Sequence, residues 1–516
     1  MSTILHSDWL RRLLYKMGIE YVPTELTFDD ILVYPQERSE IPSRRDDRLT
    51  LFSQISPNIT LKMPVIASPM DTVCEHEMAI ACARNGGLGL IHRHLTIPEQ
   101  VKQIELVKRA ESLVIPEPYS VSPDTTLSDV KRESKDKGVG GFLVQNDTGE
   151  LLGVISEHDI DLTRLLTQED IKTHEAMTPL EKLILGDPDI NLERAVELML
   201  KHRVKKIPLV DSSGRVAGLV SKKSILRLQN PLAVRDSRDR LAVGAALGLD
   251  DRMMERAGAL VEAGVDILAL FVANGYLKRV EEATRDLKRN FPDTDLAVGS
   301  VADYHGVERL FDAGADAAFV GIGPGSICET REVAGVGRAQ FTALRLAQRA
   351  ARKHGKFILA DGGVSKQHHF VKAIFAGASA TVLGKVFAGT DEAPPELRRI
   401  DGRWVKYHRG LASDDAKQQA DEIYGKVKDD VDPDSIWEYV YKNVHAEGVE
   451  SGFVEYTGSA QDAIRSITGG LRSCMTYLGT WNIEEFWQAC NRGRYSRITD
   501  SGSREGKPHD LLGFTT

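Results

Sequence analysis

Eight short apolar segments, separated by stretches with helical periodicity, are the feature of this 516-residue chain that most limits its fold. Three of the helical stretches end in an Ala-Gly pair, at Gly264, Gly314 and Gly377, directly before the next apolar segment. Glycine adopts the left-handed conformation that ends a helix, so each pair marks a return to the sheet. The expected strands cover residues 64–68, 88–92, 241–246, 266–271, 296–300, 317–322, 357–361 and 381–384. This alternation predicts an α/β protein with a (β/α)8 TIM barrel, and an open doubly wound sheet is disfavoured because no Gly-x-Gly-x-x-Gly turn follows the first strand.

A tandem repeat with an offset of 65 residues interrupts the barrel pattern after the second strand. Residues 142–149 match residues 207–214, and residues 153–160 match residues 218–225. Each copy predicts a helix, two strands joined by a Gly-containing turn, and a second helix start. The two copies resemble an inserted tandem CBS (Bateman) module over residues 114–228. This resemblance implies an adenine or guanine nucleotide bound between the copies, and a purely structural role in assembly stays open.

Charge and composition exclude several classes of protein. The formal net charge is −9, so no global positive field attracts nucleic acid or an anionic membrane. No apolar run approaches the ~20 residues that span a bilayer, and none of the five cysteines sits in a Cys-x-x-Cys pair. We therefore expect a cytoplasmic protein with free thiols that binds neither nucleic acid nor membrane.

The most informative stretch follows the sixth strand and reads Gly-Ile-Gly-Pro-Gly-Ser-Ile-Cys over residues 321–328. Glycines let several backbone N–H groups converge on one anion, and Ser326 adds a hydroxyl beside Cys328. An isolated cysteine is more often a small buried apolar residue. The surrounding glycine loop favours a functional thiol here.

The next two strands end in residues suited to a phosphorylated ligand. Asp361-Gly-Gly363 ends strand seven and Gly384-Lys385 ends strand eight, where barrels of this type bind phosphate. Asp361 can accept hydrogen bonds from a ribose diol, Gly363 and Gly384 permit close backbone approach, and Lys385 offers a charge partner. One phosphorylated ligand and one thiol are therefore expected on the same rim.

These motifs resemble the family of IMP dehydrogenase and GMP reductase, together with residues 67–73, His92-Arg93, residues 389–394 and residues 469–473. The resemblance covers about residues 25–480. It implies GMP or IMP as substrate, NADP(H) or NAD(H) as cofactor, Cys328 as the nucleophile at purine C2, and a homotetramer or octamer. A thiolate adduct divides one difficult substitution into two easier steps. The implied substrate contacts are Ser68, Met70, Gly325, Ser326, Asp361, Gly363, Gly384 and Lys385.

The resulting domain organisation has a barrel in two parts with additions at both ends. Leu10, Leu13, Leu14 and Met17 have helical spacing and predict a short amphipathic helix. The expected parts are an N-terminal helix at 1–24, the barrel at 25–113 and 229–480, the CBS pair at 114–228, an active-site flap at about 411–464, and a tail at 481–516.

The flap distinguishes the two activities of the family. Its dehydrogenases use a flap arginine followed by tyrosine to activate water, and residues 411–464 contain no arginine. Its reductases use a threonine two residues after the cysteine and a glutamate on the flap to protonate the departing amine, and Thr330 and Glu447 match them. We therefore expect reduction of GMP by NADPH, with Cys328, Thr330 and Glu447 as catalytic residues. IMP dehydrogenation stays open, with Arg409 or Arg465 in the arginine's role.

Cofactor contacts are expected after the fourth strand, at Phe271, Asn274 and Gly275. Phe271 replaces an aspartate of the family and Glu329 a threonine, so a catalytically impaired, nucleotide-sensing relative is a further alternative. The dehydrogenase relatives also imply a K⁺ site at the carbonyls of Gly323, Gly325 and Cys328. Four histidines lack metal-ligand spacing and are expected on the rim or surface, namely His92, His94, His368 and His369.

Overall fold

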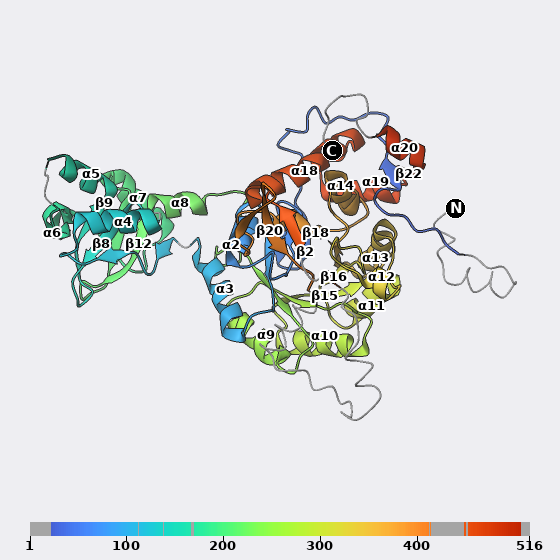
Figure 1. Ribbon diagram of the computed structural model, residues 1–516, viewed down its shortest axis with the longest axis horizontal. Helices are drawn as coiled ribbons and strands as arrows, with labels where there is room; N and C mark the ends of the chain where they lie inside the picture. The colour runs from blue at the N-terminus through green and yellow to red at the C-terminus, as the bar shows by residue number, and fades with distance from the viewer. Residues whose placement is uncertain are drawn as a thin grey trace. The chain divides into compact units, whose positions relative to one another are not determined.

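The computed structural model describes residues 22–111, 113–137, 139–166, 170–411, 413, 448–449 and 452–506 (Figure 1). The described parts of Met1–Val107 and Leu232–Thr516 form one compact unit, and those of Lys108–Pro231 form a second. The predicted N-terminal helix, most of the predicted flap and Glu447 lie outside the described residues. Among the described residues, no helix is both long enough and apolar enough to cross a membrane.

Eight strands close into a barrel in the order β13, β14, β15, β16, β17, β18, β4, β5, and every neighbouring pair is parallel. Each strand overlaps one predicted segment, so the (β/α)8 barrel is confirmed. The strands are β4 (Val65–Ala67), β5 (Leu88–Ile91), β13 (Gly244–Leu247), β14 (Ile267–Phe271), β15 (Asp295–Val301), β16 (Ala317–Val320), β17 (Phe357–Asp361) and β18 (Ala380–Leu383).

Helices alternate with the strands and cover the barrel (Figure 1). The Ala-Gly helix ends are as predicted, since Gly264, Gly314 and Gly377 have φ values of +90°, +112° and +119°. The main helices are α2 (His76–Arg84), α3 (Ile97–Arg109), α9 (Met253–Glu262), α10 (Lys278–Asn290), α11 (Tyr304–Asp312), α13 (Gln340–His354), α14 (Gln367–Phe375), α18 (Ala460–Leu478) and α19 (Ile483–Asn491). Shorter helices are α12 (Thr330–Val333), α15 (Lys385–Ala388) and α20 (Asp500–Glu505).

A hairpin of β2 (Ser53–Ser56) and β3 (Ile59–Leu61) closes the N-terminal end of the barrel. Its apolar side chains join the cluster that fills the barrel interior. At its rim, Ser53 Oγ donates to the carbonyl of Ser379, 2.5 Å away, and Asn58 bonds both carboxylate oxygens of Asp295. Ser379 and Asp295 lie at or just before the first residues of their strands. The hairpin therefore leaves the C-terminal end as the open end of the barrel.

Two small sheets lie outside the barrel in the same unit. One pairs β1 (Ile31–Val33) with β22 (Tyr495–Arg497), and joins residues far apart in the chain. The other contains β19 (Leu397–Ile400), β20 (Arg403–His408) and β21 (Gly452–Glu455). Strand β20 ends just before the predicted flap and β21 lies within its C-terminal part, and the two strands pair antiparallel.

The second unit contains two copies of one arrangement. The helix, hairpin and following helix of the first copy are α4 (Leu127–Lys137), β8 (Gly141–Gln145), β9 (Leu151–Ser156) and α5 (Glu157–Leu166). Those of the second copy are α7 (Leu192–His202), β11 (Lys206–Val210), β12 (Val216–Ser221) and α8 (Lys222–Leu228). Every corresponding element starts 65 residues later, the offset of the sequence repeat. Additional short elements are β6 (Val114–Ile115), β7 (Ser120–Val121), α6 (Thr173–Ala176), β10 (Thr178–Pro179) and the 3₁₀ helix Leu180–Lys182.

Candidate active site

A cavity of about 260 Å³ opens at the C-terminal end of the barrel strands. Sites of (β/α)8 enzymes lie at this end. Eight residues predicted for substrate, cofactor, cation or catalysis line it, namely Ser68, Met70, Phe271, Gly323, Gly325, Cys328, Thr330 and Asp361. Six others do not line it, namely Asn274, Gly275, Ser326, Gly363, Gly384 and Lys385. Arg93 and Ser300 line the cavity as well, and the sequence analysis assigned neither of them a contact.

The half-buried Cys328 is the only cysteine in the lining of this cavity. Its Sγ lies 3.2 Å from Oγ1 of Thr330, the first residue of α12, and either atom can be the donor. A turn holds the thiol in place, because the N–H of Cys328 donates to the carbonyl of Gly325. Burial raises the pKa of each of the other cysteines, which makes them poor nucleophiles.

Arg331 ties the two ends of the cysteine loop together, a role that the sequence analysis missed. Its Nε donates to the carbonyl of Ile322 at 3.1 Å, and its guanidinium also donates to the carbonyl of Arg338. Two glycines make room for this side chain. A Cβ at Gly323 would lie 2.5 Å from Arg331 Cγ, and one at Gly337 would lie 2.6 Å from Arg331 Nε. The glycines on both sides of Arg331 in the sequence are the signal from which this role of Arg331 could have been predicted.

Arg331 lies partly buried in this loop. Burial lowers the pKa of its guanidinium, and Cys328 and Glu25 oppose that fall.

Asp361 forms the opposite wall of the cavity. Loss of contact with water raises the pKa of its carboxyl to about 7, and a hydrogen bond from Ser300 Oγ, 3.2 Å from Oδ2, opposes that rise. Gln340 fixes the backbone here by donating Nε2 to the carbonyls of Val320 and Asp361. Gly321 is required beside it, since a Cβ there would lie 2.0 Å from the Asp361 carbonyl oxygen. A ribose diol in the cavity would meet an acceptor carboxylate.

The loops after β16 and β17 meet backbone to backbone. A Cβ at Gly362, which has a φ of +75°, would lie 3.0 Å from the backbone nitrogen of Gly325. Gly363 packs against Pro324, and a Cβ at Gly384 would lie 3.2 Å from Met70 Sδ. The glycines predicted to bind phosphate therefore converge near the thiol loop. Lys385 and Ser326 are exposed at its edge.

Two residues of the predicted flap, Gly448 and Val449, contact the cysteine loop. Gly448 forms an antiparallel bridge with Cys328, and Val449 donates its N–H to the carbonyl of Ile327 at 3.1 Å. The N–H of Gly410 in turn donates to the carbonyl of Val449. The three chain segments therefore meet at the mouth of the cavity.

The segment after β14 supplies an apolar wall. Phe271, Val272 and Ala273 line the cavity, and the ring of Phe271 packs edge-on against Phe319 with centroids 5.1 Å apart. Asn274 is exposed and accepts a hydrogen bond from the N–H of Tyr276, so it shapes the following turn. Gly275 packs against the Ser300 carbonyl, 2.7 Å from where a Cβ would be. Phe271 therefore forms part of the cavity wall, whereas Asn274 and Gly275 shape the turn behind it.

The predicted K⁺ site consists of carbonyls from one loop. The Gly325 carbonyl already accepts the Cys328 N–H, but a carbonyl oxygen has a second lone pair. Oxygen ligands of this kind suit a hard cation. The residues present therefore fit such an ion.

A buried polar layer lies next to the cavity wall, and here the expectation for two histidines is wrong. His92 and His94 are 2% and 3% exposed instead of lying on the rim, because α2 and α3 cover the segment after β5. Burial lowers the pKa of His94 to about 4. Arg409 forms an ion pair with Asp71 in the same region, and their side chains are 12% and 11% exposed.

The structure also places His368 and His369 beside Asp29, a carboxylate that the sequence analysis did not connect to them. His369 is buried rather than on the surface. Its Nε2 lies 3.2 Å from Asp29 Oδ1, while Ser365 contacts its Nδ1. Lys372 Nζ contacts Nδ1 of His368 at 3.3 Å. Because Nδ1 of His369 accepts the N–H of Ser365, its Nε2 carries the hydrogen and donates to Asp29. His368 Nε2 is farther from the same carboxylate oxygen, at 3.7 Å.

Comparisons with known proteins agree with this geometry. The model for the IMP dehydrogenase / GMP reductase domain matches residues 25–509. Inosine-5′-monophosphate dehydrogenase of Aquifex aeolicus is 39% identical over 489 residues, covering 94% of this chain and 95% of that protein. The enzyme of the same name from Nitrosopumilus maritimus is 36% identical over 491 residues, covering 94% and 98%.

Solved structures of GMP reductase from Trypanosoma brucei are similar over nearly the whole chain. A cysteine-to-alanine variant in complex with guanosine 5′-monophosphate has a TM-score of 0.81 and 37% identity, covering 95% of this chain and 99% of that one. The complex with guanosine 5′-triphosphate has a TM-score of 0.72 and 34% identity, covering 94% and 100%. Proteins named for two different reactions thus share this architecture.

Proposed function

Because this chain belongs to the IMP dehydrogenase / GMP reductase family of oxidoreductases, we propose that it reduces GMP to IMP with NADPH and releases ammonia. The observation that carries this proposal is the 3.2 Å contact between Cys328 Sγ and Thr330 Oγ1, beside a flap that contains no arginine. A dehydrogenase must activate water to release its product. A reductase must protonate an amine, which a hydroxyl and a carboxylate can do.

The first step is covalent. The Cys328 thiolate adds to purine C2 and forms a C–S bond. The exocyclic C–N bond then breaks, and the amino group leaves as ammonia after taking up a proton. Thr330 is placed to pass that proton, because its hydroxyl lies next to the sulfur that holds C2. Glu447 is the proposed source of the proton, since the next residue, Gly448, pairs with Cys328.

The second step removes the purine from the enzyme. The nicotinamide, when bound, supplies a hydride to C2. The C–S bond breaks as IMP forms, and Cys328 keeps the electron pair as a thiolate. The wall of Phe271, Val272 and Ala273 orients the ring and excludes water from it. NADPH is the proposed donor and NADH the alternative. A K⁺ held by the carbonyls of Gly323, Gly325 and Cys328 would brace the loop.

Substrate positioning falls to the cavity walls. Asp361 accepts from the ribose diol, and Ser68 and Met70 contact the base. The converging loops that contain Gly325, Ser326, Gly363 and Gly384, with Lys385 at their edge, form the proposed phosphate site. Gln340 of α13 braces two of these loops by donating to the carbonyls of Val320 and Asp361.

IMP dehydrogenation is the second candidate, because the similar curated proteins named above are dehydrogenases. The two arginines that flank the flap are poorly placed for that reaction. Arg409 is held by Asp71, and the Arg465 side chain is 70% exposed on α18. Neither lines the cavity.

A direct assay separates the candidates. The purified protein, given GMP and NADPH, is expected to consume the reduced cofactor and to release one ammonia per IMP formed. The Cys328→Ala variant should lose about a thousandfold or more in kcat while still binding GMP. Reduction of NAD that requires IMP would replace this proposal with the dehydrogenase. Protection of Cys328 from iodoacetamide by GMP, without turnover in either direction, would favour a nucleotide sensor.

We propose further that the second unit is a CBS pair that binds an adenine or guanine nucleotide between its copies. Lys206 of the second copy donates to the Gly140 carbonyl of the first at 3.4 Å. Burial lowers the pKa of Lys206, and the charge of Asp159 from the first copy opposes that fall. A cation, a carboxylate and a glycine from the two copies therefore lie close together. ATP or GTP should raise the melting temperature of the full chain, and Lys206→Glu should abolish that rise. Assembly as a homotetramer or octamer and a cytoplasmic location belong to the same proposal.

A further inference from the structure

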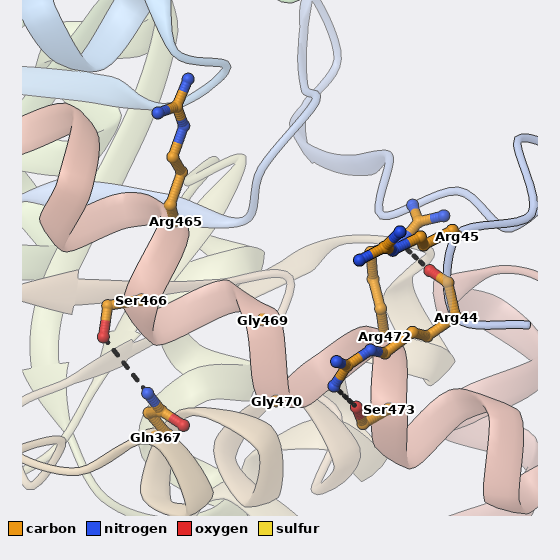
Figure 2. Close-up of a pocket in the computed structure, with 9 residues that line it drawn as sticks. All are labelled: Arg44, Arg45, Gln367, Arg465, Ser466, Gly469, Gly470, Arg472 and Ser473. Atoms are coloured by element: carbon orange, nitrogen blue, oxygen red, sulfur yellow. Dashed lines mark hydrogen bonds between the residues drawn. The ribbon is translucent and has the colours of Figure 1, made fainter.

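A hollow of about 760 Å³ lies on the outer surface of α18, away from the cysteine cavity. Figure 2 shows the residues that line it, which come from α18, from the start of α14 and from the loop before β2. Four arginines, two serines, two glycines and one glutamine form its walls, and no acidic or aromatic side chain does. They are Arg44, Arg45, Gln367, Arg465, Ser466, Gly469, Gly470, Arg472 and Ser473.

The positive charge of this hollow is poorly balanced by its surroundings. Within the part of the chain that the structure describes, no carboxylate pairs with Arg44, Arg45 or Arg472, and Arg465 has only Asp462 at 3.9 Å. The chain as a whole carries a net charge of −9. The positive charge of a hollow lined by four arginines therefore contrasts with the acidic character of the rest of the chain. Unpaired guanidinium groups in a hollow create a local positive potential.

Arg472 is fixed in position before any ligand arrives. Its Nε, NH1 and NH2 donate to the carbonyls of Arg44, Leu49 and Asp46 at 2.6, 2.8 and 2.7 Å. Burial lowers the pKa of Arg472, and the nearby charge of Asp46 only partly opposes that fall. The same three bonds anchor the loop that carries Arg44 and Arg45. Arg44 also donates to Ser473 Oγ at 3.3 Å (Figure 2).

The face of α18 gives the hollow its length. Arg465, Gly469 and Arg472 follow at spacings of four and three, which places them on one side of the helix. Seven residues of helix separate the two arginines by roughly 10 Å along the axis. In Figure 2 Arg465 stands at one end and the group of Arg44, Arg45 and Arg472 at the other. A Cβ at Gly469 would meet no atom within 4 Å, so the floor between the two ends is open.

These features define the chemistry of the ligand. Arginine pairs with phosphate oxygens through two parallel hydrogen bonds, which makes it the residue best suited to phosphate recognition. A single phosphate cannot span the two ends, whereas a chain of phosphates can. Extended single-stranded nucleic acid would also require aromatic side chains for base stacking, and the lining has none. We propose that this hollow binds a polyphosphate group, either as an inorganic chain or as the triphosphate of a nucleotide.

The experiment measures the binding of inorganic triphosphate to the full chain by titration calorimetry at physiological salt. Triphosphate is expected to bind at one site per chain, about tenfold or more tightly than orthophosphate, since each added guanidinium contact contributes. Arg44→Glu with Arg45→Glu should weaken binding at least about tenfold. The matched control is Arg289→Glu with Arg398→Glu, which changes the net charge equally on exposed positions elsewhere. Equal affinity in the two double variants would overturn the proposal.

A second pair of variants is needed because the double arginine substitution could disturb the loop that carries Arg44 and Arg45. Gly469→Glu puts a carboxylate on the open floor without altering an arginine, and it should abolish triphosphate binding. Gly469→Ala should bind as the original chain does. GTP and ATP distinguish the two sources of the ligand. Both measurements use the Lys206→Glu background, which removes the nucleotide site proposed for the second unit. If the hollow takes the nucleotide's triphosphate, Gly469→Glu will weaken the remaining nucleotide binding; if it takes only an inorganic chain, that binding will stay unchanged.

The outcome is independent of the reaction proposed above. The arginine variants lie outside the cysteine cavity and should reduce GMP at the original rate. A chain that binds triphosphate but does not reduce GMP refutes only the proposed reaction. A chain that reduces GMP but does not bind triphosphate at all refutes only the polyphosphate site.

Discussion

The backbone of Gly448 pairs with that of Cys328, so the residue that follows Glu447 lies directly against the nucleophile loop. Val449 reinforces the contact through its hydrogen bond to Ile327. The pairing gives a structural reason to test that carboxylate first.

Glu447→Gln is expected to lower kcat for GMP reduction by about 10² to 10⁴, the usual contribution of a general acid. The amide cannot donate a titratable proton, but it preserves size and polarity. Alkylation of Cys328 by iodoacetamide should stay at its original rate, because the thiol and its loop are unchanged. Glu450→Gln is the matched control three residues along, and it should keep full activity. Equal losses in both variants would remove Glu447 from the proton path.

Arg331→Ala is expected to destabilise the protein, because it removes the hydrogen bonds that join the two ends of the cysteine loop. Loss of the bonds to the carbonyls of Ile322 and Arg338 should cost about 1 to 3 kcal/mol of unfolding free energy, measured by denaturant unfolding. Arg398→Ala, at an exposed position of β19, is the matched control and should leave the stability unchanged. Equal stability of the two variants would show that Arg331 does not hold the loop.

The raised pKa of Asp361 leads us to expect that ligand binding depends on pH. Its pKa is raised to about 7 because the cavity wall shields it from water. Only the ionised carboxylate accepts two hydrogen bonds from a ribose diol, so affinity should rise as pH increases from 6 to 8. Guanosine is the suitable probe, since it lacks a phosphate that titrates in the same range. Asp361→Asn should bind weakly at both pH values, and a pH dependence that persists in this variant would contradict the assignment.

The same group affects stability in the opposite direction. The folded pKa of Asp361 is above the unfolded value of about 3.9, so the folded chain holds a proton that the unfolded chain releases. The contribution of Asp361 to the free energy of unfolding therefore falls as pH rises from about 4 to about 7. Without ligand, Asp361→Asn should stabilise the protein more at pH 8 than at pH 5, as measured by denaturant unfolding.

The dehydrogenase alternative requires Arg409 to be available for catalysis, and the strength of its ion pair with Asp71 can be measured as a change in unfolding free energy. Arg409→Met leaves the carboxylate of Asp71 without its partner in a nearly buried position, and this should cost about 3 to 5 kcal/mol. Asp71→Asn with Arg409→Met should cost less than the sum of the single changes, because the two residues interact. Additive costs would mean that the ion pair does not hold Arg409 and that it is available for other chemistry.

Local patterns were enough to predict the barrel. Each strand is a short apolar run. The positive φ values of Gly264, Gly314 and Gly377 occur where an Ala-Gly pair ends a helix, and that pair is visible in the sequence. The repeat offset of 65 residues likewise reappears in corresponding elements of the second unit. Such features depend on neighbours in the chain, so they can be read without knowledge of the tertiary structure.

Features that depend on distant segments could not be predicted in this way. His92 and His94 carry no local mark of burial, because the helices that cover them follow later or earlier in the chain. Asp29 approaches His369 across 340 residues. The arginine hollow joins the loop at Arg44 to a helix more than 400 residues away. Glycine spacing around Arg331 was visible, but its meaning required the geometry of the loop.

Strands β5 and β13 pair directly, with Leu90 beside Gly244, although more than 120 residues of the second unit intervene in the chain. The two strands that precede and follow the second unit are thus joined by their own hydrogen bonds. The barrel closes without any strand from Lys108–Pro231. We therefore expect that this unit can be removed or exchanged for another domain while the barrel still folds.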